Sequence, residues 1–231
     1  MAINKQLQFH TIKPELKTIL SELMNEPLFD DFVLVGGTNL SLRLGHRKSV
    51  DIDLFTDAEY GSIDFKELEN YLQWRYPYYD TVSTSGPTAF GNTYYIGQDK
   101  DSSIKLDLMY TDAPFFEKHN INKGIRMATI NQITAMKIEA INTGGRKKDW
   151  WDIHELLTIY TLDEMLSLHK RWEQWTHNRE QLLDKLIIFN NADKEPDPIC
   201  LKGKNWDIIK MDIIKEVKKL TQLTQSFSPK P

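Results

Sequence analysis

The chain has 231 residues, 40% of them hydrophobic, and a formal net charge of −4. This composition provides enough apolar surface for a packed core in one large domain or two small ones, and it excludes a disordered chain. The single cysteine, Cys200, excludes an internal disulfide, and no apolar run reaches the ~20 residues that would cross a bilayer. Because the first residues lack the apolar stretch of a signal peptide, we expect a cytoplasmic protein with no membrane partner.

Two predicted elements lead to a glycine turn. Apolar residues at helical spacing after Pro14 predict a first helix, and the continuous apolar run 32–35 predicts a short buried strand. Gly36 and Gly37 permit a positive φ and let the backbone approach a ligand closely. We expect Thr38 to N-cap the short helix that follows, and the free N–H groups at that helix start would suit a phosphate.

The next segment predicts a strand with paired carboxylates. Its alternation places Asp51 and Asp53 on one face and Val50, Ile52 and Leu54 on the other. The two carboxylates would lie about 7 Å apart along the strand and repel each other. A divalent cation would remove that repulsion, and Mg²⁺ prefers such oxygen ligands. The alternative is a half-buried strand whose acidic face lies in water.

A helix and three strands are predicted next. Asp64 and Glu67 predict a capping box for a helix that ends before Pro77. The period then changes to two, and segments bounded by Gly, Pro or Asp predict strands at 79–83, 88–96 and 103–110. Asp107 is the single carboxylate on the last of these, where it shares a face with Lys105.

Beyond Pro114 the pattern becomes helical, which predicts a boundary between lobes at 1–115 and 116–231. Between positions 117 and 148 the chain carries seven Lys or Arg against two acids. This basic stretch is either a surface for a polyanionic substrate or an ordinary solvated surface. Further helices are predicted after Thr129, after the capping box of Thr161 and Glu164, over 179–189 and over 206–224.

A lysine interrupts the apolar arc of the helix after Thr129. Lys137 falls between Ile133 and Ile141 at 100° per residue, and Asp149 lies on the buried face of the next predicted helix. One explanation is a structural ion pair between two packed helices. The other is that both side chains project into a cleft, where Lys137 would contact a phosphate of a nucleotide.

Two blocks of the sequence resemble a known family. Gly-Gly-Thr, a helix and Gly-His-Arg-x-Ser-x-Asp-x-Asp-Leu-Phe, over 36–55, resemble the nucleotidyltransferase toxins of the AbiEii/AbiGii type, within the DNA polymerase β-like nucleotidyltransferase superfamily. Met-Lys-x-x-Ala and Gly-Arg-x-x-Asp-x-x-Asp-Ile, over 136–153, are similar to the second block of these toxins. Thr38 replaces the serine common in the superfamily, and Lys148 replaces the arginine that usually precedes Asp149. The resemblance covers roughly residues 30–160.

The resemblance implies an α/β (α+β) fold, with a mixed-sheet catalytic lobe over 1–115 followed by a helical lobe over 116–231. It implies an NTP as co-substrate, Mg²⁺ as cofactor, an RNA acceptor such as tRNA, and a separately encoded antitoxin. The residues it implies for the triphosphate are Gly36, Gly37, Thr38, Arg47 and Lys137. Those for the metal are Asp51, Asp53 and Asp107, and the catalytic set is Asp51, Asp53, Asp107, Lys137 and Asp149.

Two other classes of function keep part of this pattern. A small-molecule nucleotidyltransferase of the antibiotic-modifying sort would share the metal site but would not need the basic stretch. A non-catalytic relative that binds nucleotides or a partner would keep the glycine turn and lose carboxylates. This chain keeps all three carboxylates, which favours an enzyme.

Overall fold

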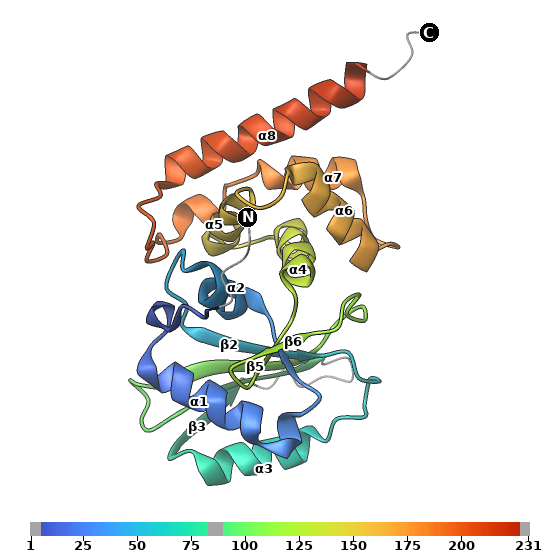
Figure 1. Cartoon of the computed structure of the whole chain (residues 1–231). Helices are drawn as coiled ribbons and strands as arrows, with labels where there is room; N and C mark the ends of the chain where they lie inside the picture. Colours follow the sequence, from blue (N-terminus) through green and yellow to red (C-terminus); the bar gives the residue numbers. More distant parts are fainter. Residues whose placement is uncertain (1–5, 83–89, 227–231) are drawn as a thin grey trace. The chain divides into compact units, whose positions relative to one another are not determined.

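The structure is a computed structural model that describes residues 6–82 and 90–226 (Figure 1). The chain forms two compact units, and the division falls between Thr129 and Ile130. Three short 3₁₀ helices connect larger elements: η1 (Phe9–Thr11), η2 (Pro27–Phe29) and η3 (Ala192–Lys194). None of the helices in the described ranges is long and apolar enough to cross a membrane.

A seven-stranded mixed sheet organises the first unit, which confirms the predicted fold class. Its strands are β1 (Val33–Leu34), β2 (Asp51–Thr56), β3 (Tyr78–Val82), β4 (Gly91–Gly97), β5 (Ile104–Tyr110), β6 (Asn120–Asn122) and β7 (Ile125–Met127). The order across the sheet is β3-β4-β5-β2-β1-β7-β6. β2 pairs with β5 in parallel and with β1 antiparallel. Positions 83, 88 and 89 of the predicted strands lie outside the described residues.

The last two strands correct the predicted boundary between lobes. Residues 116–129 were expected to open the helical lobe, but β6 and β7 lie in the sheet, where β7 pairs with β1 through Met127 and Leu34. Ile125 and Met127 are buried, and Arg126 between them donates to the main-chain carbonyl of Phe32 at 3.0 Å. The alternation of period two over three residues is too short to stand out in the sequence.

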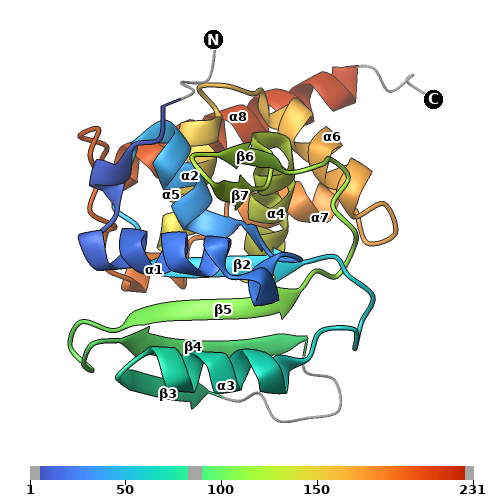
Figure 2. The ribbon, with the colours of Figure 1, turned by 60° about the horizontal axis from the view of Figure 1, so that its bottom comes forward.

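Three α helices complete the first unit: α1 (Pro14–Asn25), α2 (Gly36–Leu44) and α3 (Phe65–Arg75). Pro14 begins α1 as predicted, and the Asp64 side chain caps α3 by accepting from the N–H of Glu67 at 3.0 Å. α1 and α3 pack on one face of the sheet (Figure 2), where Leu20 and Leu72 join one buried cluster with Ile52. Each such fully buried side chain contributes roughly 1.5–3 kcal/mol.

The packing of α1 and α3 covers one face of the sheet, so the opposite face is the one left open for a functional site. The buried members of β2 and β5, such as Leu54 and Leu106, face α1 and α3, so the alternate residues face away from these helices. Val50 was predicted on the apolar face, but it precedes β2 and is 53% exposed. The core therefore holds the strands in place and leaves their polar face for a site.

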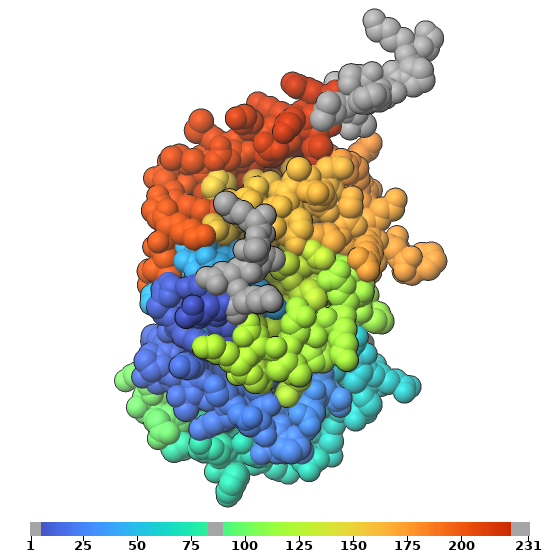
Figure 3. Space-filling view, in the orientation of Figure 1, coloured from blue at the N-terminus to red at the C-terminus, as the bar shows by residue number. Residues whose placement is uncertain are grey.

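The second unit is helical. It contains α4 (Ile130–Asn142), α5 (Lys147–Leu156), α6 (Leu162–Trp172), α7 (Arg179–Leu186) and α8 (Trp206–Ser226). α4 packs against α5, α6 and α7. Both halves of the predicted capping box of Thr161 and Glu164 are present at the start of α6. α8 buries Ile209 and Ile213 and leaves Met211 69% exposed. Figure 3 shows α8, in orange-red, at the surface of this unit.

Candidate active site

Three carboxylates share the open face of the sheet. Asp51 and Asp53 are half-buried while Ile52 between them is fully buried, so the predicted alternation of β2 is confirmed. The parallel register of β2 and β5 sets Asp107 beside Asp53 and Lys105 beside Asp51. Side chains at paired positions of adjacent strands lie within contact range. The predicted third carboxylate thus joins the pair from the neighbouring strand.

Both oxygens of Asp107 are engaged. Thr93 on β4 donates its hydroxyl to Oδ1 at 2.6 Å, and the ammonium of Lys105 forms an ion pair with Oδ2. Partial burial works against the charge of Lys105, but Asp107, Asp53 and Asp51 outweigh it and raise the pKa of this lysine. The sequence placed Lys105 on this face without giving it a role.

The glycine turn lies directly against the carboxylates. α2 begins at Gly36, whose φ of +67° is in the left-handed region. A Cβ at Gly36 would lie 2.0 Å from Asp53 Oδ2, so only glycine fits there. The N–H groups and positive dipole end of α2 therefore face the same space as Asp53. The sequence predicted this meeting of the turn and the carboxylates.

Thr38 does not cap α2 as predicted. The N-cap position is Val35, and Thr38 lies inside the helix with its side chain fully buried. Its hydroxyl is hydrogen-bonded to Ser49 Oγ at 2.9 Å and to the main-chain carbonyl of Asp51. The helix begins at Gly36, three residues earlier than expected, so Thr38 ties α2 to the start of β2. Its predicted contact with a nucleotide stays a prediction.

Arg47 lies on the other side of the glycine turn. Its side chain is buried, and Nη1 donates to the main-chain carbonyl of Lys48 at 3.0 Å. A Cβ at Gly37 would lie 2.3 Å from Arg47 Nη2, so the guanidinium rests against the glycine backbone. A fixed cation beside free helix N–H groups is a suitable partner for phosphate oxygens.

A buried ionic cluster occupies the helical unit. Lys137 Nζ lies 2.6 Å from Asp149 Oδ1 and 2.8 Å from Asp152 Oδ2. Asp149 Oδ2 also accepts from the N–H of Arg146 at 2.9 Å, which closes the start of α5. The predicted ion pair is therefore present, with Asp152 as a further partner. Whether Lys137 also contacts a nucleotide stays a prediction.

Part of the basic stretch forms ion pairs within the two units. Four of its seven cations form ion pairs: Arg126 with Asp30, Lys137 with Asp149, Arg146 with Glu195 and Lys147 with Asp197. Arg126 also donates to the main-chain carbonyls of Met24 and Phe29. Lys137 and Lys147 are buried in these pairs, whereas the Arg146 side chain stays 64% exposed. The interpretation of this stretch as a surface for a polyanionic substrate stays a prediction.

The donor set of the open face fits Mg²⁺ in part. Asp51 and Asp53 offer carboxylate oxygens of the kind that this cation prefers. Within residues 6–82 and 90–226, however, no group of three or more His, Cys, Asp or Glu side chains is arranged to hold a metal. Asp107 is held by Thr93 and Lys105, so it would have to exchange a partner to become a ligand.

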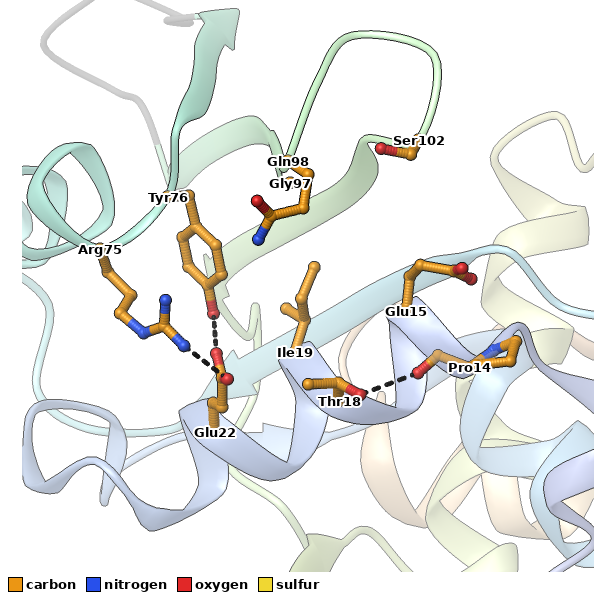
Figure 4. A pocket seen from close by; sticks show the side chains of 10 residues that line it. All are labelled: Pro14, Glu15, Thr18, Ile19, Glu22, Arg75, Tyr76, Gly97, Gln98 and Ser102. Atoms are coloured by element: carbon orange, nitrogen blue, oxygen red, sulfur yellow. Dashed lines mark hydrogen bonds and ion pairs between the residues drawn. The ribbon is translucent and has the colours of Figure 1, made fainter.

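A separate hollow lies on the other side of the sheet (Figure 4). It has a volume of about 250 Å³ and lies between α1, the end of α3 and the β4–β5 turn. Glu22 pairs there with Arg75 at 2.6 Å and accepts from the Tyr76 hydroxyl at 3.1 Å. Burial, with Glu22 beside it, raises the pKa of Tyr76. Arg75 and Tyr76 are thus both hydrogen-bonded to Glu22. The hollow lies on the opposite face of the sheet from Asp51, Asp53 and Asp107.

The glycine turn, the paired carboxylates and the mixed sheet are the features by which this chain resembles nucleotidyltransferases. The sequence model described as "Nucleotidyl transferase AbiEii toxin, Type IV TA system" matches residues 18–226, and the chain belongs to this family of nucleotidyltransferase toxins. An uncharacterized protein of Aquifex aeolicus (strain VF5) is 28% identical over 191 residues, which are 80% of this chain and 86% of that protein.

Three solved structures share the fold. A putative nucleotidyltransferase from H. pylori has a TM-score of 0.56 at 20% identity and covers 93% of this chain and 95% of its own. JHP933 from Helicobacter pylori has a TM-score of 0.54 at 21% identity, with 91% and 92% covered. The nucleotidyltransferase toxin MenT4 from Mycobacterium tuberculosis H37Rv has a TM-score of 0.57 at 16% identity, with 89% and 82% covered.

Proposed function

We propose that the protein transfers a nucleoside monophosphate from an NTP to an acceptor hydroxyl, with Mg²⁺ held by Asp51 and Asp53. One observation carries this proposal: the N-terminus of α2 at Gly36 lies against the carboxylate of Asp53. An anion-binding helix start and a cation-binding carboxylate pair in contact suit a metal–triphosphate ligand. Arg47 against Gly37 adds a fixed positive charge for the phosphates.

The chain's residues take distinct parts in this reaction. The N–H groups at Gly36 and Gly37 and the guanidinium of Arg47 bind and orient the triphosphate. A bond forms between the acceptor oxygen and the α-phosphorus while the bond from that phosphorus to the bridging oxygen breaks, and pyrophosphate leaves. Asp107, once released from Lys105, takes the proton of the attacking hydroxyl. When bound, Mg²⁺ neutralises charge that develops on the phosphate oxygens.

The second block completes the proposed catalytic set. Lys137 is assigned to a phosphate of the nucleotide, and Asp149, which pairs with it at 2.6 Å, fixes the position of its ammonium. These roles follow from the family's second block at 136–153 and from the burial of both side chains. A lysine desolvated between carboxylates is a well-positioned point charge.

We further propose RNA, such as tRNA, as the acceptor and a separately encoded antitoxin as the genetic partner. The family's description as a type IV toxin–antitoxin system supports a cytoplasmic toxin with such a partner. The decisive experiment incubates the protein with each α-labelled NTP and total cellular RNA, with Mg²⁺ or with EDTA. We expect label in RNA with Mg²⁺ alone. Label in a small molecule of the antibiotic class, and none in RNA, would replace this proposal by the antibiotic-modifying alternative.

A further inference from the structure

Lys105 occupies a central position on the open face of the sheet. It lies beside Asp51 of β2 on one side and Tyr95 of β4 on the other, and it precedes Asp107 by two residues on the same face of β5. Its ammonium forms an ion pair with Asp107 Oδ2, and the two side chains are 34% and 15% exposed. The lysine is therefore partly withdrawn from water and directed at the carboxylates.

The strands around Lys105 carry mostly negative charge. Lys105 is the only Lys or Arg in β2, β4 and β5. The face formed by these strands carries the three carboxylates of Asp51, Asp53 and Asp107, while Thr93 and the other β4 neighbours on it are uncharged. Three close carboxylates resist ionising together, and the ammonium of Lys105 relieves part of that repulsion.

We propose that Lys105 is the internal counter-ion of this carboxylate face. Its ammonium holds Asp107 while no divalent cation is bound and releases Asp107 when a divalent cation binds. Asp107 then changes partner from an ammonium to the cation. The inference rests on the proposed function, because it assumes that Asp51 and Asp53 bind a divalent cation. The inference adds Lys105 as a residue that sets how tightly Asp51 and Asp53 bind the cation.

The physical consequence is a competition. A cation that enters this face must approach the like charge of Lys105, and recruiting Asp107 requires the ion pair to break. Removing the ammonium therefore strengthens metal binding, although it weakens the metal-free fold. An ordinary ion pair within one strand, with no metal site beside it, would affect the stability alone.

The test measures Mn²⁺ binding by electron paramagnetic resonance in wild-type protein and Lys105→Met, with Lys66→Met as the matched control. Lys66 is in the same unit, pairs with Glu69 at 3.6 Å and has a 71% exposed side chain. We expect Lys105→Met to bind Mn²⁺ at least about tenfold more tightly, and Lys66→Met to bind as wild type does. The melting temperature of Lys105→Met should fall without metal and recover with Mn²⁺.

A double-mutant cycle with Asp107→Asn locates the effect. The gain from Lys105→Met should shrink in the Asp107→Asn background, since the competition takes place at that carboxylate. Lys105→Gln replaces the Met variant if the latter does not fold. Unchanged or weaker Mn²⁺ binding in both Lys105 variants would overturn the inference and leave the proposed function intact. No Mn²⁺ binding in wild type or in any variant would overturn both.

Discussion

Lys137 of α4 and Asp149 of α5 form a buried ion pair, with 2.6 Å between Nζ and Oδ1 and side chains that are 7% and 9% exposed. Asp152, whose side chain is fully buried, lies 2.8 Å from the same ammonium. One lysine thus serves two carboxylates. Such a cluster need not stabilise the fold relative to an apolar core, but removing one member is costly.

The first prediction concerns this cluster. Lys137→Met keeps the aliphatic stem and removes the charge, so Asp149 and Asp152 lose their ammonium partner. We expect a loss of about 3 kcal/mol or more in the free energy of unfolding. We also expect a large fall in nucleotidyl transfer, because the lysine is proposed to contact phosphate. Chemical denaturation and an NTP-transfer assay measure both, and exposed Lys170→Met on α6 is the matched control.

Adding Asp149→Leu separates a structural from a catalytic role. The double mutant should recover part of the stability, and only part, since Asp152 remains with no exposed surface. Activity should not return. A double mutant that is stable and fully active would show that the cluster is only a packing ion pair.

The second prediction addresses the paired carboxylates. Asp51→Asn and Asp53→Asn should each reduce transfer by at least about 100-fold, because each removes a charged metal ligand. Without metal, melting temperatures should change little, since a repulsive pair is relieved. Asp53→Asn should be slightly the less stable of the two, because Asp53 lies at the positive end of α2.

Asp80→Asn is the control for these two variants, because Asp80 is exposed on the same sheet at β3. It should keep full activity. Wild-type rates in either Asp51→Asn or Asp53→Asn would remove that residue from the site.

The third prediction concerns the glycine turn. Gly37→Ala places a Cβ where Arg47 Nη2 now lies, at 2.3 Å, so the flexible guanidinium must move. We expect a folded protein whose NTP affinity is about ten- to hundredfold weaker, as for a lost charge-assisted hydrogen bond. Gly37→Val should behave likewise. Isothermal titration with each NTP measures the affinity.

Gly124→Ala is the reference for this substitution. Gly124 has a φ of +80°, and a Cβ added there would meet open space. The change therefore strains the backbone in the same unit without touching the glycine turn at Gly36 and Gly37. It should lower stability and leave affinity unchanged. Equal NTP affinity in Gly37→Ala and wild type would place the triphosphate elsewhere.

The fourth prediction is a pH dependence in the helical unit. Burial alone would raise the pKa of Glu155, but Lys202 and Lys204 outweigh it and hold the pKa below its ordinary value of 4.5. The stabilisation is therefore present above about pH 4.5 and is lost as the pH falls through the lower folded value. Glu155→Gln should lower stability at pH 7 by about 1.5–3 kcal/mol and flatten this acid loss.

Thermal melts between pH 7 and pH 3 check this behaviour. Glu180→Gln, at an exposed position of α7, should reproduce the wild-type curve. If Glu155→Gln loses stability in acid as steeply as wild type, the ion pairs of Glu155 do not govern that region of the curve.

Local sequence patterns predicted the parts of the site that lie close together in the chain. The alternation around Asp51 and Asp53 and the glycines at 36 and 37 are each local signals, and both were confirmed in the first unit. Asp107 required only that its strand be recognised, because its alternation fixes the face. Periodicity over six or seven residues is enough for such predictions.

Features that depend on tertiary pairing were missed or misplaced. Thr38 has the chemistry of an N-cap, but its hydroxyl is used by Ser49 and Asp51, which no local rule foresees. The three-residue strands at 120–122 and 125–127 exist because β1 offers an edge, not because of their own pattern. The sequence did not show that Lys105 is the cation beside the three carboxylates, because that position depends on the register of β2 and β5.

The pairing of β7 with β1 also has a consequence for synthesis on the ribosome. Until Met127 has been translated, β1 lacks its neighbour β7 and has an open edge. The main-chain carbonyls of Phe29 and Phe32 likewise lack the hydrogen bonds that Arg126 donates in the finished unit. Contacts this distant in sequence form slowly, because the chain must first close a long loop. Asp51 and Asp53 therefore emerge well before the sheet around them is complete, and the nascent toxin acquires its catalytic fold only near the end of its first unit.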